Sequence, residues 1–179
     1  MKKTLQILFL ILTLVLPSFV SAEVPAKPAF SGYVYDYANV ISASDEYLMN
    51  LYGQTVDSLE IAQVVAITVE SLSGIDAADF STQLINSWGI GRVSANDGVV
   101  LLLAPNERRI QIGTGSGIDN QLSAETCGLL LDQFAIPSLS VNDFSDGMVS
   151  LMKATCAKLL LEKHPIFDDR DMINKLLSD

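Results

Sequence analysis

Two short, almost purely apolar segments do most to limit the folds open to this chain. Gln63 to Val69 and Gly98 to Leu103 are rich in valine, isoleucine and leucine, and neither alternates polar with apolar residues. Short continuous apolar runs of this kind are typical of strands that are buried on both faces. The two segments therefore predict the interior of an α/β domain, with helices over at least one face of a small sheet, and over both if the first strand is to avoid water.

The segments around these two strands complete the expected order of elements. Arg108 to Thr114 alternates polar with apolar residues, so we expect a third strand with one solvated face after a turn at Pro105 to Glu107. In the first helix, Leu48, Leu51, Thr55 and Leu59 recur at helical spacing. Four helices are predicted in all: from Ser42 or Ser44 to about Leu59, Asp76 to Trp88, Ser123 to Ile136 with Pro137 as its end, and a long helix from Asp143.

The first 22 residues have the pattern of a secretory signal. Lys2 and Lys3 precede an apolar run from Leu5 to Leu16, and Val20-Ser21-Ala22 fits a small-residue cleavage site. The alternative is an anchor that is kept in the membrane. We expect a periplasmic or secreted protein with no membrane span after cleavage. The expected organisation is a signal peptide at 1–22, a linker at 23–32, one domain at 33–163 and a charged tail or short helix at 164–179.

Charge and cysteine content narrow the classes of partner and site. The formal net charge is −10 at pH 7, and such a surface repels nucleic acid and anionic lipid, so no nucleic-acid partner is expected. It suits cation binding, or solubility alone. Cys127 and Cys156 share helical faces with apolar residues and should point into the core, either as free thiols or as a disulfide between helices. With His164 as the single histidine and no C-x-x-C, a zinc or thiol-redox site is not expected.

The candidate site lies in the stretch from Trp88 to Leu122. If Ala104 pairs with Arg108 across the turn, Asp97 lies opposite Gly115. The N-D-G loop at 96–98 and the G-S-G-I-D loop at 115–119 then meet at the end of the sheet away from the turn. The loop-shaping glycines Gly98, Gly115 and Gly117 would permit close backbone approach and positive φ. Asn96, Asp97 and Asp119 would offer oxygen ligands to a hard cation, Ca²⁺ or Mg²⁺. The alternative is ordinary turn chemistry without a ligand.

Several motifs in order resemble the TPM domain family. They are Y-D-Y-A-N-V-I-S at 35–42, A-Q-V-V-A-I-T-V-E-S-L at 62–72, W-G-I-G at 88–91, N-D-G-V-V-L-L-L at 96–103 and R-R-I-Q-I-G-T-G-S-G-I-D at 108–119. The resemblance spans about Tyr33 to Leu161 and implies a three-layer α/β/α sandwich with a small central mixed sheet. It also implies acidic loops at one end of that sheet that bind divalent metal in some members. Asp36, which matches the family's aspartate before the first helix, joins the implied metal ligands.

Two departures from the family pattern bear on the metal. The usual D-N-G is Asn96-Asp97-Gly98 here, which moves a carboxylate by one residue, and the usual glutamate after the second loop is the shorter Asp119.

Three functions follow from these observations, and none of them assigns a catalytic residue. The first is an exported, non-catalytic domain that binds a divalent cation at the acidic loops, contacts envelope or secreted proteins, or does both. The second is a phosphatase acting on phosphomonoesters, an activity attributed to plant members of the family. Arg92, Ser94 and Ser116 would then be the local groups for phosphate contact or attack. The third is a protein-interaction module without a ligand.

Overall fold

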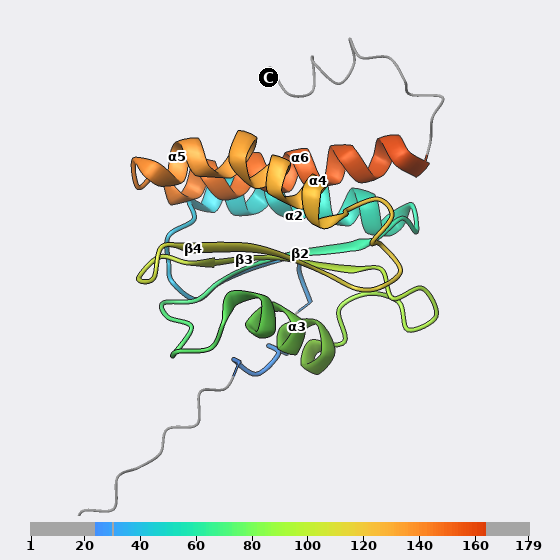
Figure 1. Ribbon diagram of the computed structural model, residues 1–179, viewed down its shortest axis with the longest axis horizontal. Coiled ribbons are helices and arrows are strands. Elements are labelled where there is room, and N and C mark those ends of the chain that lie inside the picture. The colour runs from blue at the N-terminus through green and yellow to red at the C-terminus, as the bar shows by residue number, and fades with distance from the viewer. Residues whose placement is uncertain (1–23, 30, 164–179) are drawn as a thin grey trace, which may run out of the picture.

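A four-stranded sheet lies between two layers of helices in the computed structural model (Figure 1), which describes residues 24–29 and 31–163. The strand order is β1-β2-β3-β4. β1 (Val34–Asp36), β2 (Gln63–Thr68) and β3 (Gly98–Ala104) run parallel, and β4 (Arg109–Thr114) runs antiparallel to β3. The predicted α/β class, its three layers and its mixed sheet are confirmed. The predicted signal peptide and C-terminal tail lie outside the described residues.

The helices divide unequally between the two faces of the sheet. α3 (Ala77–Trp88) covers one face alone, and α2 (Ala43–Ser58) and α6 (Phe144–Lys163) cover the other, together with α4 (Ala124–Leu130), the π-helical turn η1 (Leu131–Ala135) and α5 (Ile136–Ser140). Side chains of β2 and β3 alternate between two apolar clusters, one beneath α3 and one beneath α2 and α6. Both strands are buried along nearly their whole length, as their unbroken hydropathy predicts.

The strand β1 is not among the strands predicted from the sequence. Its three residues pair with the far end of β2, Val34 opposite Ala66. The Tyr35 ring meets the Trp88 indole edge to face, with ring centroids 4.9 Å apart. The preceding segment, predicted to be a linker, also contacts that indole: Trp88 Nε1 donates to the carbonyl oxygen of Pro25 at 2.7 Å.

Helix α2 has the predicted ends but presents a different face to the core. Ser42 caps it, its Oγ accepting from the backbone N–H of Asp45. The residues with the predicted spacing, Leu48, Leu51, Thr55 and Leu59, are all exposed, whereas Met49, Gly53 and Val56 are buried. The reason is the close contact at Gly53, where a Cβ would lie 2.6 Å from Cβ of Tyr33. A glycine contributes no hydropathy signal, so the periodicity favoured the wrong face.

Pro137 begins a helix instead of ending one. The third predicted helix runs as α4 to Leu130, widens into η1 and continues as α5, with the proline in its first turn. A proline is tolerated there because the N–H it lacks has no partner within the helix. Among the helices of residues 24–29 and 31–163, none is long and apolar enough to cross a membrane.

Candidate functional site

The β3–β4 hairpin brings the two glycine loops together at the end of the sheet opposite its turn, but in a register one residue away from the prediction. Ala104 pairs with Arg109, not with Arg108, which lies in the turn with φ of +52°. Gly98 is therefore opposite Gly115, and the N–H of Gly115 donates to the carbonyl oxygen of Gly98 at 2.8 Å. Asp97 stands just outside the hairpin ladder, in the loop that enters β3.

Close backbone packing, not positive φ, explains the three loop-shaping glycines. Positive φ in this region belongs to Asn96 and to Gly89 and Gly91, and the predicted positive φ at Gly98, Gly115 and Gly117 was wrong. The predicted close approach is confirmed. A Cβ on Gly98 would lie 2.2 Å from the carbonyl oxygen of Ile90, and one on Gly117 would lie 1.7 Å from that of Ala95. The loops thus contact each other through main-chain atoms.

Asp97 is held by Arg92. Its side chain is only 4% exposed. Oδ1 accepts the backbone N–H of Arg92 at 2.8 Å, while Oδ2 accepts Nε at 2.7 Å and also Nη2. The same guanidinium donates from Nη2 to the carbonyl oxygen of Glu60 at 2.6 Å. Arg92 therefore links the end of α2 to the entrance of β3, and both carboxylate oxygens of Asp97 are in use.

The ion pair sets the protonation state of Asp97. Burial opposes its ionisation, but the side-chain and backbone hydrogen bonds from Arg92 and the charge of its guanidinium outweigh burial and hold the pKa of the carboxyl below its usual 3.8. Asp97 is accordingly a carboxylate at neutral pH. A metal ion at these oxygens would compete with Arg92, because the anion already has a cation in contact with it.

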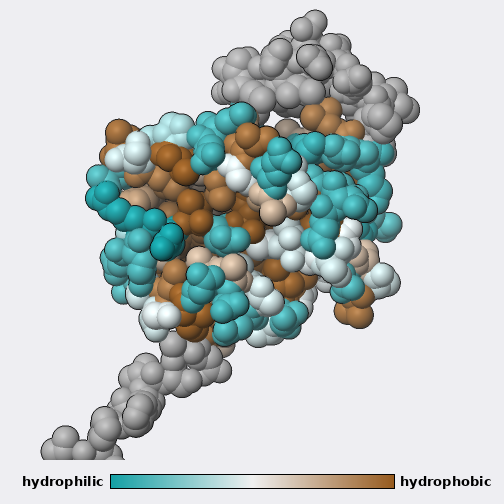
Figure 2. Space-filling model, viewed as in Figure 1, coloured by the Kyte–Doolittle hydropathy of each residue, from teal (hydrophilic) through white to brown (hydrophobic). Residues whose placement is uncertain are grey.

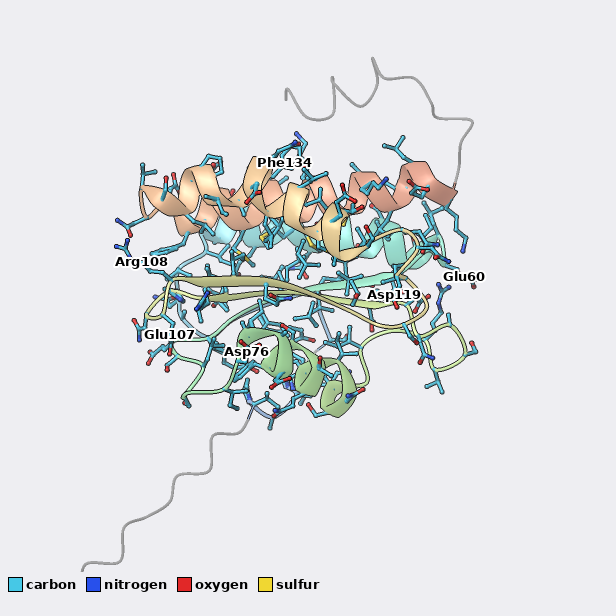
Figure 3. All side chains as sticks on the ribbon, in the orientation of Figure 1. Glu60, Asp76, Glu107, Arg108, Asp119 and Phe134 are labelled. Atoms are coloured by element: carbon cyan, nitrogen blue, oxygen red, sulfur yellow. The ribbon has the colours of Figure 1, made fainter. Side chains whose placement is uncertain are left out.

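Asn96 and Asp119 lie at the same end of the sheet, and their oxygens accept fewer hydrogen bonds than those of Asp97. The N–H of Gly117 donates to the backbone oxygen of Asn96 at 3.0 Å, which joins the second loop to the first. The Asp119 carboxylate is exposed and receives a long 3.4 Å contact from Thr114 Oγ1. Figure 3 shows Asp119 at the same end of the sheet as Glu60. Three of the predicted ligands, Asn96, Asp97 and Asp119, therefore lie at the same end of the sheet. Of these, Asp97 is already bound to Arg92.

Asp36 lies at the opposite end of the sheet from the other predicted ligands. It ends β1 and pairs with Thr68, the last residue of β2, whereas Asp97 precedes β3, which runs parallel to both. Its Oδ2 accepts the N–H of Ile41 at 2.8 Å, and Oδ1 accepts the hydroxyl of Thr68. Asp36 therefore braces the connection from β1 to α2. Among the described residues, no three or more acidic, histidine or cysteine side chains are grouped as a metal cage.

A cavity of about 390 Å³ opens beside the loops, between α3 and the end of β4. Its lining combines hydroxyl and amide side chains with the backbone of Gly89 to Gly91, and includes Thr82, Asn86, Arg92, Asn96, Thr114 and Ser116. Of the three predicted phosphate contacts, Arg92 and Ser116 line it and Ser94 does not. Val93 stands at the rim of the cavity and is 96% exposed. The lining offers hydrogen bonds but no carboxylate, imidazole or thiol.

Cys127 and Cys156 are both free and buried, which is the first of the two predicted alternatives. Burial raises the pKa of the Cys156 thiol to about 12, and burial together with the charge of Asp119 raises that of Cys127. Raised pKa values leave both as unreactive thiols at neutral pH.

The sequence analysis does not predict the ion pair between Arg92 and Asp97. The sequence predicts Arg92 as a phosphate contact and Asp97 as a metal ligand, and it does not pair the two. The sequence does contain a signal for this pair, because an arginine and an aspartate lie five positions apart at the two ends of a short loop, in a chain with few cations.

Comparisons with known proteins agree with this fold. The sequence profile described as the TPM domain matches residues 34–158. An NMR structure of the N-terminal domain of a P. gingivalis protein superposes with a TM-score of 0.67 at 24% identity, covering 73% of this chain and 83% of that one. The N-terminal domain of the cg2496 protein from Corynebacterium glutamicum gives 0.57 at 22% identity, covering 76% and 86%. At these identities the two structures are informative about fold alone. No functionally curated protein matches significantly.

Proposed function

The chain belongs to the TPM domain family, and on that premise we propose that it is an exported, non-catalytic domain that binds a partner protein of the envelope or the secreted fraction through its loop end. The observation that carries this proposal is the position of Val93. A valine that is 96% exposed stands on a loop fixed by the ion pair of Arg92 with Asp97. A rigid apolar tip loses little conformational entropy on binding, which favours it as a contact with another protein.

The cavity beside the tip supports binding more than hydrolysis. Its hydroxyl and amide groups can donate to and accept from a partner's main chain. The serine that lines it, Ser116, has no imidazole, thiol or carboxylate beside it in the lining to take its proton. Arg92, the cation that would contact a phosphate, is occupied by Asp97. These features favour a binding module over a phosphatase.

Site-specific photocrosslinking tests the partner-binding proposal. We expect p-benzoylphenylalanine at position 93 to trap a second protein in cells that export this chain. The matched control carries the same group at Val141, which is 73% exposed and follows α5 near the hairpin turn. An adduct from position 93 but not from 141 is the expected result. Equal adducts from both positions, or none from 93, would contradict a contact through the loop end.

A second candidate function, weak binding of a divalent cation at the same end, rests on the exposed carboxylate of Asp119. Asn96, whose side-chain oxygen could join it, is in the adjoining loop. The backbone oxygens of these loops are further neutral ligands of the kind that Ca²⁺ accepts. With Asp97 held by Arg92, such a site has one free carboxylate and a low ligand charge. Affinity falls with ligand charge, so we propose a dissociation constant for Ca²⁺ on the order of 10⁻³ M.

An NMR titration with CaCl₂, repeated with MgCl₂, measures this affinity. We expect saturable shifts at the amides of residues 95–97 and 115–119, and their loss in Asp119→Asn. Asp79→Asn removes an equal charge from the exposed side of α3 and should leave the titration unchanged. Absence of shifts up to about 10 mM, ten times the expected constant, would rule out the cation. Shifts that persist in Asp119→Asn would place the ion elsewhere.

A further inference from the structure

A second cavity, of about 360 Å³, lies at the turn end of the β3–β4 hairpin, far from the loop end. Figure 2 shows a hydrophobic hollow between β4 and the helices α4 and α5, with hydrophilic side chains at its left edge. The cavity is lined by Leu103, Arg108, Arg109, Ile110, Ile136, Leu139, Ser140 and Phe144. The hairpin, α5 and the start of α6 all contribute to it.

The lining separates into an apolar floor and a cationic mouth. Leu103 is buried, and Ile110, Leu139 and Phe144 are half-buried around it, while Arg108 and Arg109 are exposed. Among the described residues, neither arginine takes part in an ion pair. Arg108 Nη2 has a long contact of 3.4 Å with Asn142 Oδ1, which is too long to be a strong hydrogen bond. Two arginines that are consecutive in the sequence thus have no carboxylate partner in a chain of net charge −10. Arg109 is opposite Ala104, on the face of β4 towards α3, whereas Ile110 is on the face towards α5 and α6.

Three carboxylates that are close to the lining residues in sequence are engaged with other groups. Asp143 Oδ1 accepts the N–H of Asp146 at 3.2 Å. Glu107 Oε1 accepts from Ser71 Oγ at 2.5 Å and from the N–H of Leu72 at 3.0 Å. Figure 3 shows Glu107 towards the α3 layer and Arg108 towards the α5 layer. Asp146 Oδ2 accepts from Ser138 Oγ at 2.5 Å. The positive charge at the mouth therefore lies beside apolar surface without a carboxylate in contact.

Unusual backbone conformations occur in and beside the walls of the cavity. Arg108 and Asn142 have φ of +52° and +63°, in the left-handed region that non-glycine residues seldom occupy. The π turn Leu131–Ala135 directly precedes α5. Leu139 packs directly on Gly147, where a Cβ would lie 2.8 Å from its Cδ2. Strained residues and π turns concentrate at functional sites, where the surrounding structure holds them in place.

We propose that this cavity binds a small amphiphile of the fatty-acid type. The apolar chain lies against Leu103, Ile110 and Phe144, and the carboxylate is received by Arg108, with Arg109 as a second cation of the lining. Guanidinium groups suit this role because their planar donors match the two oxygens of a carboxylate. The volume is at the small end of ligand cavities, which favours a medium-length chain. This site is independent of the loop end and of the function proposed there.

Titration with sodium decanoate, followed by amide NMR of the complete domain, tests the proposal. We expect saturable shifts at Arg109, Ile110, Leu139 and Ser140, and an affinity at least about tenfold lower in the double variant Arg108→Gln/Arg109→Gln, which removes the charge-assisted hydrogen bonds. The control Lys153→Gln/Lys158→Gln removes the same charge from α6, roughly 14 and 21 Å along that helix from Phe144, and should bind decanoate as the unaltered protein does. Arg108 and Arg109 are exposed, whereas Lys153 and Lys158 are half-buried and Lys158 also pairs with Glu162. A urea unfolding curve of each variant therefore accompanies the titration.

Three further probes fix which part of the ligand matters. Acetate, which has the head group alone, and decyltrimethylammonium, which has the chain with the opposite charge, should produce no saturable shift at the cavity. Equal binding of decyltrimethylammonium, or unchanged decanoate affinity in the arginine variant, would overturn the proposal in favour of non-specific apolar adsorption. The third probe is the peptide acetyl-Ala-Leu-Val with a free carboxylate. If it produces shifts and decanoate does not, the cavity binds the carboxyl terminus of a peptide and not a fatty acid.

Discussion

Replacing Arg92 with alanine is expected to lower the free energy of unfolding by about 3 kcal/mol at pH 7. The substitution leaves the carboxylate of Asp97 buried without its cation and removes the link to the carbonyl oxygen of Glu60. Breaking a buried pair typically costs 3–5 kcal/mol. We take the lower end because the Arg92 side chain is 35% exposed, so water can reach the space it vacates. Urea unfolding followed by circular dichroism measures the loss.

The pH dependence of the loss identifies the ion pair as its cause. In the unaltered protein the pKa of Asp97 is lowered, so its stabilising contribution is complete above the unfolded value of 3.8 and disappears as the pH falls below it. In Arg92→Ala the buried carboxyl favours its neutral form, so the penalty is relieved as the pH falls. The difference in unfolding free energy between the two proteins should therefore narrow from pH 7 towards pH 3.

Two further variants separate this effect from general loss of an arginine. Arg109→Ala removes an exposed arginine without an ion pair and should change stability by less than about 0.5 kcal/mol. Arg92→Ala/Asp97→Asn should recover part of the loss, because the unpaired charge is gone. If Arg92→Ala and Arg109→Ala unfold at the same urea concentration, or if the loss does not vary with pH, the ion pair does not stabilise this fold.

Substituting Gly117 with alanine is expected to cost about 3 kcal/mol or more, at the upper end of the range for overpacking. The new Cβ would lie 1.7 Å from the carbonyl oxygen of Ala95 and 3.1 Å from that of Asn96. Both atoms belong to the backbone, so no side chain can rotate away and one loop must move. That movement also breaks the 3.0 Å hydrogen bond from the N–H of Gly117 to Asn96. Chemical unfolding of the variant gives the value.

Gly128 supplies the matched control for the same chemical change. It lies within α4, and a Cβ there would meet nothing within 4 Å. Gly128→Ala should raise stability by roughly 0.5–1 kcal/mol, because alanine has the higher helix propensity. Opposite signs at positions 117 and 128 are the expected result. If both substitutions changed stability by the same amount in the same direction, the main-chain contact between the loops would not contribute to stability.

Much of the fold could be predicted from the sequence, because its two central strands are buried on both faces. β2 and β3 are continuous apolar runs, and α3 has a capping Asp76 and a terminating Gly89. The exceptions share a physical origin. β1 has three residues, too few to reveal a period, and the buried face of α2 depends on a glycine that fits against Tyr33. Both features depend on tertiary contacts, which the hydropathy pattern of the sequence does not reveal.

The candidate site was harder to predict, because its geometry depends on strand direction. Once β1 is recognised as parallel to β3, Asp36 at the carboxyl end of β1 must lie away from Asp97 at the amino end of β3. The hairpin register also depends on whether Arg108 belongs to the turn. Arg108 has a left-handed backbone conformation, which is uncommon for arginine and could not be predicted from the sequence. The loop end itself was found correctly, because its glycines and acids are close together in sequence.

The order of the strands in the sheet has a consequence for folding kinetics. β3 and β4 join through a turn of four residues, so their pairing closes a very short loop at small entropic cost. β1, at the other edge, pairs Val34 with Ala66, 32 positions along the chain, and contributes three residues to the ladder. Its pairing must wait for α2 and β2 to be in place. The hairpin is therefore suited to be part of the folding nucleus, and the amino-terminal strand to be the last to dock and the first to open.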